Sequence, residues 1–265
     1  MDLLFSDAGM TRLAEAAQPG LLCAFDFDGT LSPIVPVPEQ ARLPDEVRER
    51  LLELSRYAPV AIITGRSLQD IRQRLGFSPD FLVGNHGIEG VPGWDFHAAH
   101  LEMMCREWLA QLSVAIREID PGIGLEDKRY SLSLHFRHAR DPDRAAARLG
   151  AILEELAPRP RIVTGKYVFN LVAPDAHHKG HALEQLVKAS KARRAVYIGD
   201  DVTDEDVFCL PRESLLSIRV ECHPDSAAEF YLPHFQDVLP ALEQLAQKLC
   251  DSGARNWLQA ADSVT

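Results

Sequence analysis

Short apolar segments alternate with helical patterns over the first ninety residues. Residues 21–27, 60–64 and 81–83 are mostly apolar, and each leads directly into glycine or polar residues. Residues 44–57 instead carry apolar side chains at helical spacing, with charges on the opposite face. This alternation predicts parallel strands joined by helices. Because ligands bind at the carboxyl edge of such a sheet, we expect the three loops to meet at one site.

A different pattern begins near residue 92. A long helical stretch at 97–119 precedes two strand-like segments, and a second helix at 142–156 precedes two more. This repeated order predicts an α+β layer, with helices on one face of an antiparallel sheet. The region is therefore expected to be an inserted α+β cap domain, residues 92–174. The predicted strands are residues 124–128, 130–137, 161–164 and 167–172.

The first pattern resumes after residue 174. The fold class predicted is thus α/β, with a Rossmann-like parallel-sheet core made by residues 1–91 and 175–265. The tail from residue 251 is expected to fray. The elements predicted here are a helix at 179–191, strands at 195–198 and 215–220, and a last helix at 238–249.

Composition narrows the classes of partner. The 265 residues include 28 Lys and Arg against 39 Asp and Glu, a net charge of −11, which argues against nucleic acid or an anionic membrane. No apolar run reaches the roughly 18 to 20 residues of a membrane-spanning helix, and the start does not resemble a signal peptide. Five scattered cysteines without a CxxC pair favour reduced, structural thiols. We expect a cytoplasmic protein that binds neither nucleic acid nor membrane.

Two carboxylates follow the first predicted strand, in the segment Phe-Asp-Phe-Asp-Gly-Thr-Leu at residues 25–31. A turn that begins after Asp26 can aim Asp26 and Asp28 in different directions, which suits two chemical roles. Taken alone, the same motif also fits an Asp-rich turn that caps the next helix. The strand before it and the motifs further along the chain favour catalysis.

The second strand ends in Ile-Ile-Thr-Gly-Arg-Ser, residues 62–67. The hydroxyl of Thr64 and the main-chain N–H groups at Gly65 can hold a phosphate oxygen. Ser67 also fits a helix N-cap, with Asp70 three residues on as in a capping box. Both interpretations can hold, because a cap and an anion site use the same free amides.

Two charged motifs follow the cap. Lys179 opens a predicted helix, where a lysine either neutralises a phosphate or is an ordinary surface residue. Residues 200–206 then place five acids directly after a predicted buried strand. They either form a solvated helix start or crowd around a cation. Ligands that are all oxygen fit Mg²⁺ better than Zn²⁺.

These four motifs in this order resemble the haloacid-dehalogenase superfamily of aspartate-nucleophile phosphotransferases. The resemblance implies that Asp26 is the nucleophile, which forms an aspartyl-phosphate, and that Asp28 is the general acid and base. The implied phosphate-binding residues are Thr64, Gly65 and Lys179. The implied Mg²⁺ ligands are Asp26, the main-chain carbonyl of Asp28, and Asp200, with Asp201 and Asp204 supporting them.

Within that superfamily, most of the chain resembles the trehalose-6-phosphate phosphatase family. The matching segments are DFDGTLSPI, ITGRS, VGNHGIE, LEDKRYSLSLHFR, GKYVFNLVAP followed by KG, and YIGDDVTDEDVF. The resemblance implies Mg²⁺-dependent hydrolysis of a small sugar phosphate, above all trehalose 6-phosphate. It also implies a functional link to a trehalose-6-phosphate synthase.

The cap offers candidate sugar-binding residues. In residues 130–137, Leu132, Leu134 and Phe136 alternate with polar residues, so one sheet face is expected to pack on the cap helices. The polar face is expected to look toward the core site or to be merely solvated. In the core, His86 matches the family's His-Gly element, where it either supports its loop or touches ligand. Cap residues that match sugar-binding positions of the family are Glu126, Lys128, Arg137 and Lys166.

Two segments depart from the family. Asn170 stands where a Glu is usual, and residues 222–227 replace a loop that usually contains glycine. Asn is shorter and uncharged, and a lost charge-assisted hydrogen bond of roughly 1.5 to 3 kcal/mol weakens binding by one or two decades. The alternatives are a phosphatase for another sugar phosphate, such as a sucrose-phosphate or a glycosyl-phosphoglycerate, a phosphomutase, or a catalytically silent sugar-phosphate sensor.

Overall fold

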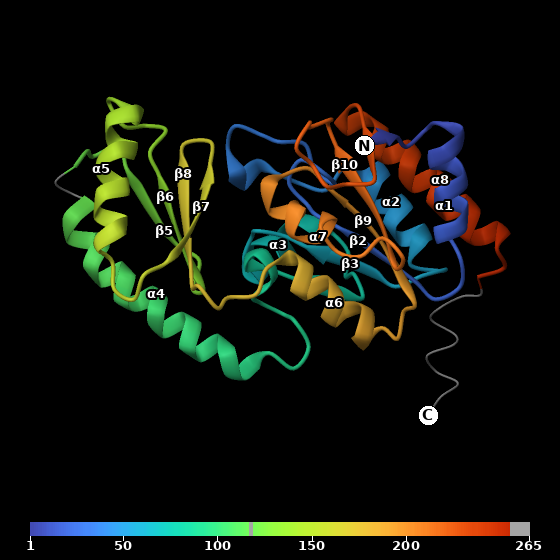
Figure 1. The fold of residues 1–265 in the computed structure, drawn as a ribbon, viewed down its shortest axis with the longest axis horizontal. Helices are drawn as coiled ribbons and strands as arrows, with labels where there is room; N and C mark the ends of the chain where they lie inside the picture. Colours follow the sequence, from blue (N-terminus) through green and yellow to red (C-terminus); the bar gives the residue numbers. More distant parts are fainter. Residues whose placement is uncertain (117–118, 255–265) are drawn as a thin grey trace. The chain divides into compact units, whose positions relative to one another are not determined.

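The computed structural model describes residues 1–116 and 119–254 (Figure 1). The chain forms two compact units. The core unit contains Met1–Pro92 and the chain from His177 onward, and the cap unit is Gly93–Ala176. Among the described residues, no helix is both long enough and apolar enough to cross a membrane.

A parallel sheet of seven strands forms the centre of the core unit, in the order β1-β11-β10-β9-β2-β3-β4. Strands such as β2 and β3 are buried along their whole length, which explains why they are apolar runs rather than alternating patterns. The predicted parallel α/β core is confirmed. Its strands are β1 (Asp2–Leu3), β2 (Leu21–Phe25), β3 (Val60–Ile63), β4 (Phe81–Val83), β9 (Arg194–Gly199), β10 (Leu215–Val220) and β11 (Phe230–Leu232).

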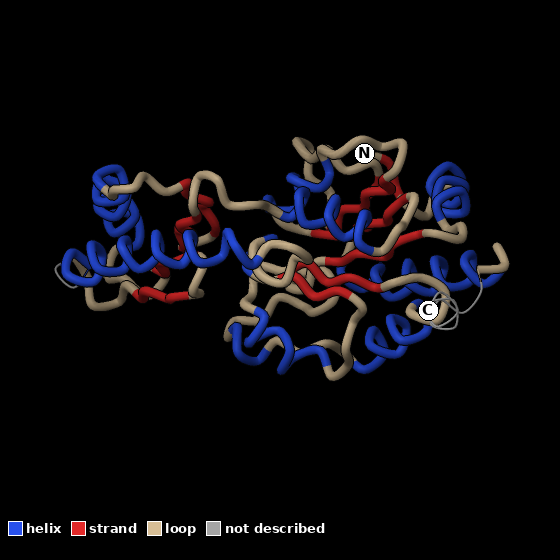
Figure 2. The backbone as a smooth tube through the Cα atoms, turned by 90° about the horizontal axis from the view of Figure 1, so that it is seen from below, coloured by secondary structure: helices blue, strands red, loops and turns tan. Residues whose placement is uncertain are grey.

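Helices lie on both sides of this sheet (Figure 2). Helices α1, α2 and α8 pack together, while α6 packs against α7 and β3. Each buries an apolar stripe, such as Val47, Leu51 and Leu54 of α2. The helices are α1 (Asp7–Ala16), α2 (Asp45–Leu54), α3 (Leu68–Leu75), α6 (Lys179–Ala189), α7 (Glu205–Phe208) and α8 (Val238–Asp251).

The strand order places a topological switch point between β2 and β9. From β2 the chain continues to β3 and β4 on one side, whereas β9 leads to β10 and β11 on the other. Loops at such a point diverge and leave room for a ligand at the carboxyl edge. The segments that begin at Asp26, Thr64 and Asp200 follow β2, β3 and β9 at this edge.

The cap unit is an antiparallel sheet with two helices, as the sequence predicts. Its strand order is β5-β6-β8-β7. Leu132 and Leu134 of β6 are fully buried, and so are Trp108 and Leu112 of one helix and Leu149 of the other. The elements are α4 (Asp95–Ala115), β5 (Gly124–Asp127), β6 (Ser131–His135), α5 (Pro142–Glu155), β7 (Arg161–Gly165) and β8 (Val168–Val172).

Element ends differ from prediction by a few residues. The helix predicted at 97–119 ends at Ala115, and residues 117–118 lie outside the described residues. The tail is predicted to fray from residue 251, but Asp251 is still helical and is the last residue of α8. Residues 255–265 also lie outside the described residues. The sequence analysis missed β1 and β11, which are too short for a period-2 pattern, and α1, which Ser6 caps through the N–H of Gly9.

Candidate active site

Main-chain pairing and a glycine fix the position of the first carboxylate motif. The N–H of Asp26 donates to the carbonyl of Ile198 at 2.9 Å, which joins the end of β2 to the end of β9. Gly29 then turns the chain with φ of +83°. A Cβ atom at Gly29 would lie 2.1 Å from Oδ2 of Asp200, so only glycine fits this turn. The two predicted acidic motifs are therefore in direct contact.

A buried lysine supplies positive charge beside Asp26. Lys179, the first residue of α6, is 1% exposed, and its Nζ lies 3.0 Å from Oδ1 of Asp26 and 2.8 Å from Oδ1 of Asp204. Burial alone would lower the pKa of Lys179, but the charges of Asp204 and Asp26 outweigh burial and raise it. Lys179 is therefore a charged partner of the candidate nucleophile, and the ordinary surface lysine is excluded.

Asp204 organises the loop after β9. Its Oδ1 accepts hydrogen bonds from Lys179 and, at 2.6 Å, from the hydroxyl of Tyr197. Its Oδ2 accepts from the N–H groups of Asp200 and Asp201 at 3.0 and 2.9 Å. Four donors thus occupy this fully buried carboxylate. Sequence reasoning missed Tyr197 because an aromatic residue inside an apolar run is indistinguishable from core.

Three carboxylates form a cluster that suits a hard divalent cation. Oxygen atoms of Asp26, Asp200 and Asp204 all lie within 4.8 Å of one another. Burial, with the charge of Asp204 adding to it, raises the pKa of Asp200 to about 7. Burial also raises the pKa of Asp26, although Lys179 counteracts it. Negative charge in the cluster thus exceeds what Lys179 balances, and the ligand atoms are all oxygen, so the residues fit Mg²⁺.

The other acids of this loop have structural contacts. Asp201 is exposed, and its side chain accepts the N–H of Asp204 at the start of the short 3₁₀ helix Val202–Asp204. Thr30, which is buried, donates its hydroxyl to Oδ1 of Asp200 at 3.0 Å. Glu205 accepts from Nη1 of Arg219 at 2.9 Å. The acidic run is therefore not simply a solvated helix start.

The loops after β3 and β4 form the candidate phosphate-binding corner. Thr64 is fully buried, and its Oγ1 accepts the N–H of Arg66 at 3.2 Å. The N–H of His86 donates to the carbonyl of Thr64 at 2.9 Å. A Cβ atom on Gly65 would lie 2.4 Å from Cε1 of His86, so the imidazole ring lies directly against Gly65. Ser67 caps α3 by accepting the N–H of Asp70, as predicted.

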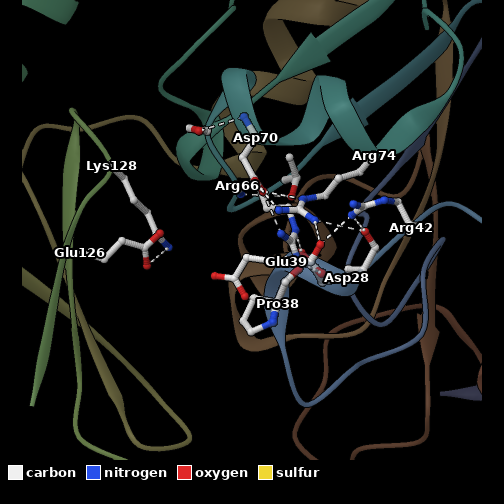
Figure 3. Close-up of polar contacts among 12 residues, drawn as sticks. Asp28, Pro38, Glu39, Arg42, Arg66, Asp70, Arg74, Glu126 and Lys128 are labelled. Carbon is white, nitrogen blue, oxygen red and sulfur yellow. Dashed lines mark hydrogen bonds and ion pairs between the residues drawn. The ribbon is translucent and has the colours of Figure 1, made fainter. Parts of the chain in front are cut away.

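Asp28 is held by a residue to which the sequence analysis gave no role. Arg66 binds both carboxylate oxygens, Nε to Oδ2 and Nη2 to Oδ1, each at 2.6 Å (Figure 3). Arg66 also donates to Asp70 at 2.8 Å. The feature of the sequence that could have indicated a role for Arg66 is its position directly after Thr64 and Gly65 at the end of a strand.

In the cap unit, the candidate sugar-binding residues have mixed surroundings. Exposed Glu126 of β5 lies 3.9 Å from Nζ of Lys128 (Figure 3). It also lies 2.9 Å from Nε2 of His135. Arg137 follows β6, Lys166 lies between β7 and β8, and both are exposed.

The expected open polar face is wrong at Ser131 and Ser133, which are 1% and 0% exposed. The hydroxyl of Ser133 donates to Oδ1 of Asn170 at 2.6 Å, and Nδ2 of Asn170 lies 3.4 Å from the carbonyl of Val163. The half-buried Asn170 therefore spends its amide largely on the cap sheet. Polar contacts between strands, which an alternating pattern does not reveal, explain the difference.

Most of this chain is similar in sequence to known proteins. A Mycobacterium tuberculosis protein described as an uncharacterized glycosyl hydrolase is 38% identical over 264 residues, covering 91% of this chain and 19% of that protein. The trehalose-phosphate phosphatase of Mycobacterium ulcerans is 32% identical over 245 residues, covering 86% of this chain and 62% of its own. The chain thus spans about a fifth and about three fifths of these relatives.

The fold has solved counterparts. The C-terminal domain of Candida albicans trehalose-6-phosphate phosphatase superposes with a TM-score of 0.75 at 24% identity, covering 93% of this chain and 98% of that domain. This likeness confirms the fold, a parallel α/β core with an inserted α+β unit. The family model for trehalose-phosphatase, a family of phosphoric monoester hydrolases, matches residues 24–236, which is more than half of the chain. The chain therefore belongs to the trehalose-phosphatase family.

Proposed function

We propose that this chain is a Mg²⁺-dependent phosphatase that hydrolyses trehalose 6-phosphate through an aspartyl-phosphate on Asp26. The observation that carries the proposal is the placement of Asp26, 4% exposed, against the buried Lys179 in a carboxylate cluster at the switch point of the sheet. A carboxylate that attacks a phosphate must overcome repulsion between like charges. Lys179 supplies one positive charge beside Asp26, and the remaining negative charge of the cluster suits a bound Mg²⁺ that would supply more.

The first half of the reaction transfers the phosphoryl group to the protein. An oxygen of Asp26 forms a bond to phosphorus while the bond from phosphorus to the sugar oxygen breaks, and Asp28 gives its proton to that oxygen. Lys179, Thr64 and the N–H groups at Gly65 hold the phosphate oxygens.

The second half releases the phosphate. Water attacks phosphorus, Asp28 takes the proton that the water loses, and the bond from phosphorus to Asp26 breaks. Mg²⁺, when bound, supplies positive charge that offsets the repulsion between carboxylate and phosphate. The groups that would hold it are Asp26, the main-chain carbonyl of Asp28, and Asp200, with Asp201 and Asp204 supporting them.

Trehalose 6-phosphate is proposed as substrate because of the family and the names of relatives. In this proposal the cap unit is the substrate-specificity domain, and a trehalose-6-phosphate synthase supplies the ester. His86, which lies against Gly65, would support the phosphate corner or touch the ligand. The residues proposed to bind the sugar are Glu126, Lys128, Arg137, Lys166 and Asn170.

One observation favours a second substrate. The carbonyl oxygen of Asn170 already accepts from Ser133, so it has little left to offer a disaccharide hydroxyl. A phosphatase for another sugar phosphate, such as a sucrose-phosphate or a glycosyl-phosphoglycerate, is therefore the alternative.

The test is a comparison of kcat/KM for phosphate release. The panel contains trehalose 6-phosphate, sucrose 6-phosphate, a glucosyl-phosphoglycerate and p-nitrophenyl phosphate, with Asp26→Asn as the control for contaminating phosphatases. We expect trehalose 6-phosphate to exceed the other sugar esters by tenfold or more. A higher value for another ester would favour the alternative, an isomerised sugar phosphate would indicate a phosphomutase, and no release from any ester would indicate a sensor.

A further inference from the structure

We propose that Arg66 is a positioning residue for Asp28, which anchors Oδ2 of the carboxylate and leaves Oδ1 as the oxygen that exchanges protons. This inference rests on the proposed function, in which Asp28 is the general acid and base. It concerns only residues of the core unit (Figure 3).

The contact between Arg66 and Asp28 is a paired one. Nε donates to Oδ2 and Nη2 donates to Oδ1, both at 2.6 Å. The side chain of Arg66 is 13% exposed and that of Asp28 is 39% exposed. A planar guanidinium that binds a carboxylate through two parallel bonds fixes both its distance and its orientation. With 39% of its side chain exposed, Asp28 keeps access to solvent and therefore to a reactant.

The two bonds of this pair are not equivalent. Among the described residues, the acceptor for Nε is Oδ2 of Asp28 alone, whereas Nη2 also donates to the carbonyl of Pro38 at 3.1 Å. When Oδ1 turns toward a reactant, Nη2 keeps an acceptor, so no buried donor is stranded. Losing the bond to Oδ2 would strand Nε, which is costly in a partly buried site. The geometry therefore frees Oδ1 and retains Oδ2.

A chain of charges holds Arg66 itself in place. Its Nη1 donates to Oδ2 of Asp70 at 2.8 Å. Both carboxylate oxygens of Asp70 also bind Arg74, which is 8% exposed. Arg74 in turn donates to the carbonyls of Glu39 and Ala41 at 2.6 and 3.2 Å.

The guanidinium carbon of Arg66 also lies 5.7 Å from the ring centroid of Phe27, next to Asp28 in the chain. The guanidinium of Arg66 thus contacts Asp70, the carbonyl of Pro38 and the ring of Phe27. These contacts fix its orientation, and the paired hydrogen bonds then fix the orientation of the Asp28 carboxylate.

The proton balance leaves Arg66 unchanged. While the bond from phosphorus to Asp26 forms and the bond to the sugar oxygen breaks, the proton on Oδ1 moves to the sugar oxygen, and Asp28 becomes a carboxylate. Arg66 stabilises that negative charge through Nε and Nη2. Water later returns a proton to Oδ1. Arg66 gives up no proton, because guanidinium does not titrate in proteins.

The experiment uses the dependence of kcat/KM on the leaving group. A sugar alkoxide needs a proton to leave, whereas p-nitrophenolate does not. For Arg66→Ala we expect a loss on the order of 10²- to 10³-fold with trehalose 6-phosphate. With p-nitrophenyl phosphate we expect a loss below about tenfold, since proton transfer contributes little there. Arg66→Lys keeps the charge but not the fork, so its leaving-group dependence should fall between those of wild type and Arg66→Ala.

Controls separate positioning from folding. Arg12→Ala removes another partly buried arginine, which pairs with Glu229 at 3.1 Å, and should leave the ratio of the two kcat/KM values unchanged. If Arg66→Ala does not fold, Arg66→Lys and Asp70→Asn must each lose more kcat/KM with trehalose 6-phosphate than with p-nitrophenyl phosphate. Equal losses with both esters would mean a structural role and would overturn the inference.

Failure of the inference differs from failure of the proposed function. Asp28→Asn should show the same selective loss, and adding Arg66→Ala to it should cost less than threefold more, because the two residues act through one proton. If Asp28→Asn shows selectivity and Arg66→Ala does not, the Arg66 inference alone fails. If Asp28→Asn loses both esters equally, the acid role of Asp28 fails.

Discussion

The two units differ in how deeply their charged candidate site residues are buried and how closely they are paired. In the core unit, Lys179, Asp26 and Asp204 are 1%, 4% and 0% exposed and lie within 3.0 Å of their partners. In the cap unit, Glu126 is exposed and its contact with Lys128 is 3.9 Å long. Buried charges persist only when they are paired, and removing one partner is expensive, whereas exposed pairs contribute little to stability.

In the proposed function, this difference corresponds to a division between chemistry in the core unit and substrate selection in the cap unit. The core charges are fixed before any ligand arrives, which suits a site that stabilises a transition state. Glu126, Arg137 and Lys166 of the cap unit are exposed, which suits the proposed role of this unit in binding the hydroxyl groups of a ligand. Substitutions in the core should therefore affect turnover and stability, and substitutions in the cap should affect KM.

Removing the metal should have the largest effect, and this effect should be confined to the core unit. With excess EDTA we expect the rate of phosphate release to fall below about 10⁻³ of the rate with Mg²⁺, because Lys179 alone does not balance the charge of the carboxylates. Added Mg²⁺ should restore the rate and raise the melting temperature, since a ligand of the folded state stabilises it. A full rate of phosphate release in EDTA would contradict the account.

Lys179→Met should have the next largest effect, this time on stability. It leaves the carboxylates of Asp26 and Asp204 without their buried cation, which should lower the free energy of unfolding by about 3 to 5 kcal/mol. The matched control is Lys188→Met on the exposed face of the same helix, which should change it by less than about 0.5 kcal/mol. Urea unfolding measures both. Equal effects would show that burial does not distinguish the two lysines.

Asn170→Glu in the cap should have the smallest effect, on KM alone. The longer, charged side chain can reach past Ser133, so KM for trehalose 6-phosphate should fall by about 10- to 100-fold, the worth of one charge-assisted hydrogen bond. The value of kcat should stay within about threefold, and Asn170→Ala is the control. A change in kcat with constant KM would show that Asn170 affects turnover. It would contradict the distinction between core residues that affect turnover and cap residues that affect KM.

The fold class and the proximity of the motifs could be predicted from the sequence, because parallel strands bring their carboxyl ends to the same edge of the sheet. Asp26 and Asp200 each follow a strand, so their proximity follows from topology alone. By contrast, Arg66 is 38 residues from Asp28, and nothing in either local pattern relates the two. Tyr197 looks like core until its hydroxyl is seen at Asp204.

The cap shows the same limit. Alternation identified the buried face of β6 through Leu132 and Leu134. It could not show that Ser133 is buried as well, because that depends on Asn170 in the neighbouring strand. Contacts between distant polar side chains are fixed by register and rotamer, which a periodic pattern does not contain.

The most direct test of the account is to trap the phosphorylated nucleophile. The protein turning over trehalose 6-phosphate with Mg²⁺ is quenched in acid and reduced with borohydride, which converts an aspartyl-phosphate to homoserine. Peptide mass spectrometry should find homoserine at position 26, and none in Asp26→Asn or without substrate. Homoserine at another aspartate, or rapid phosphate release with none at position 26, would contradict the account.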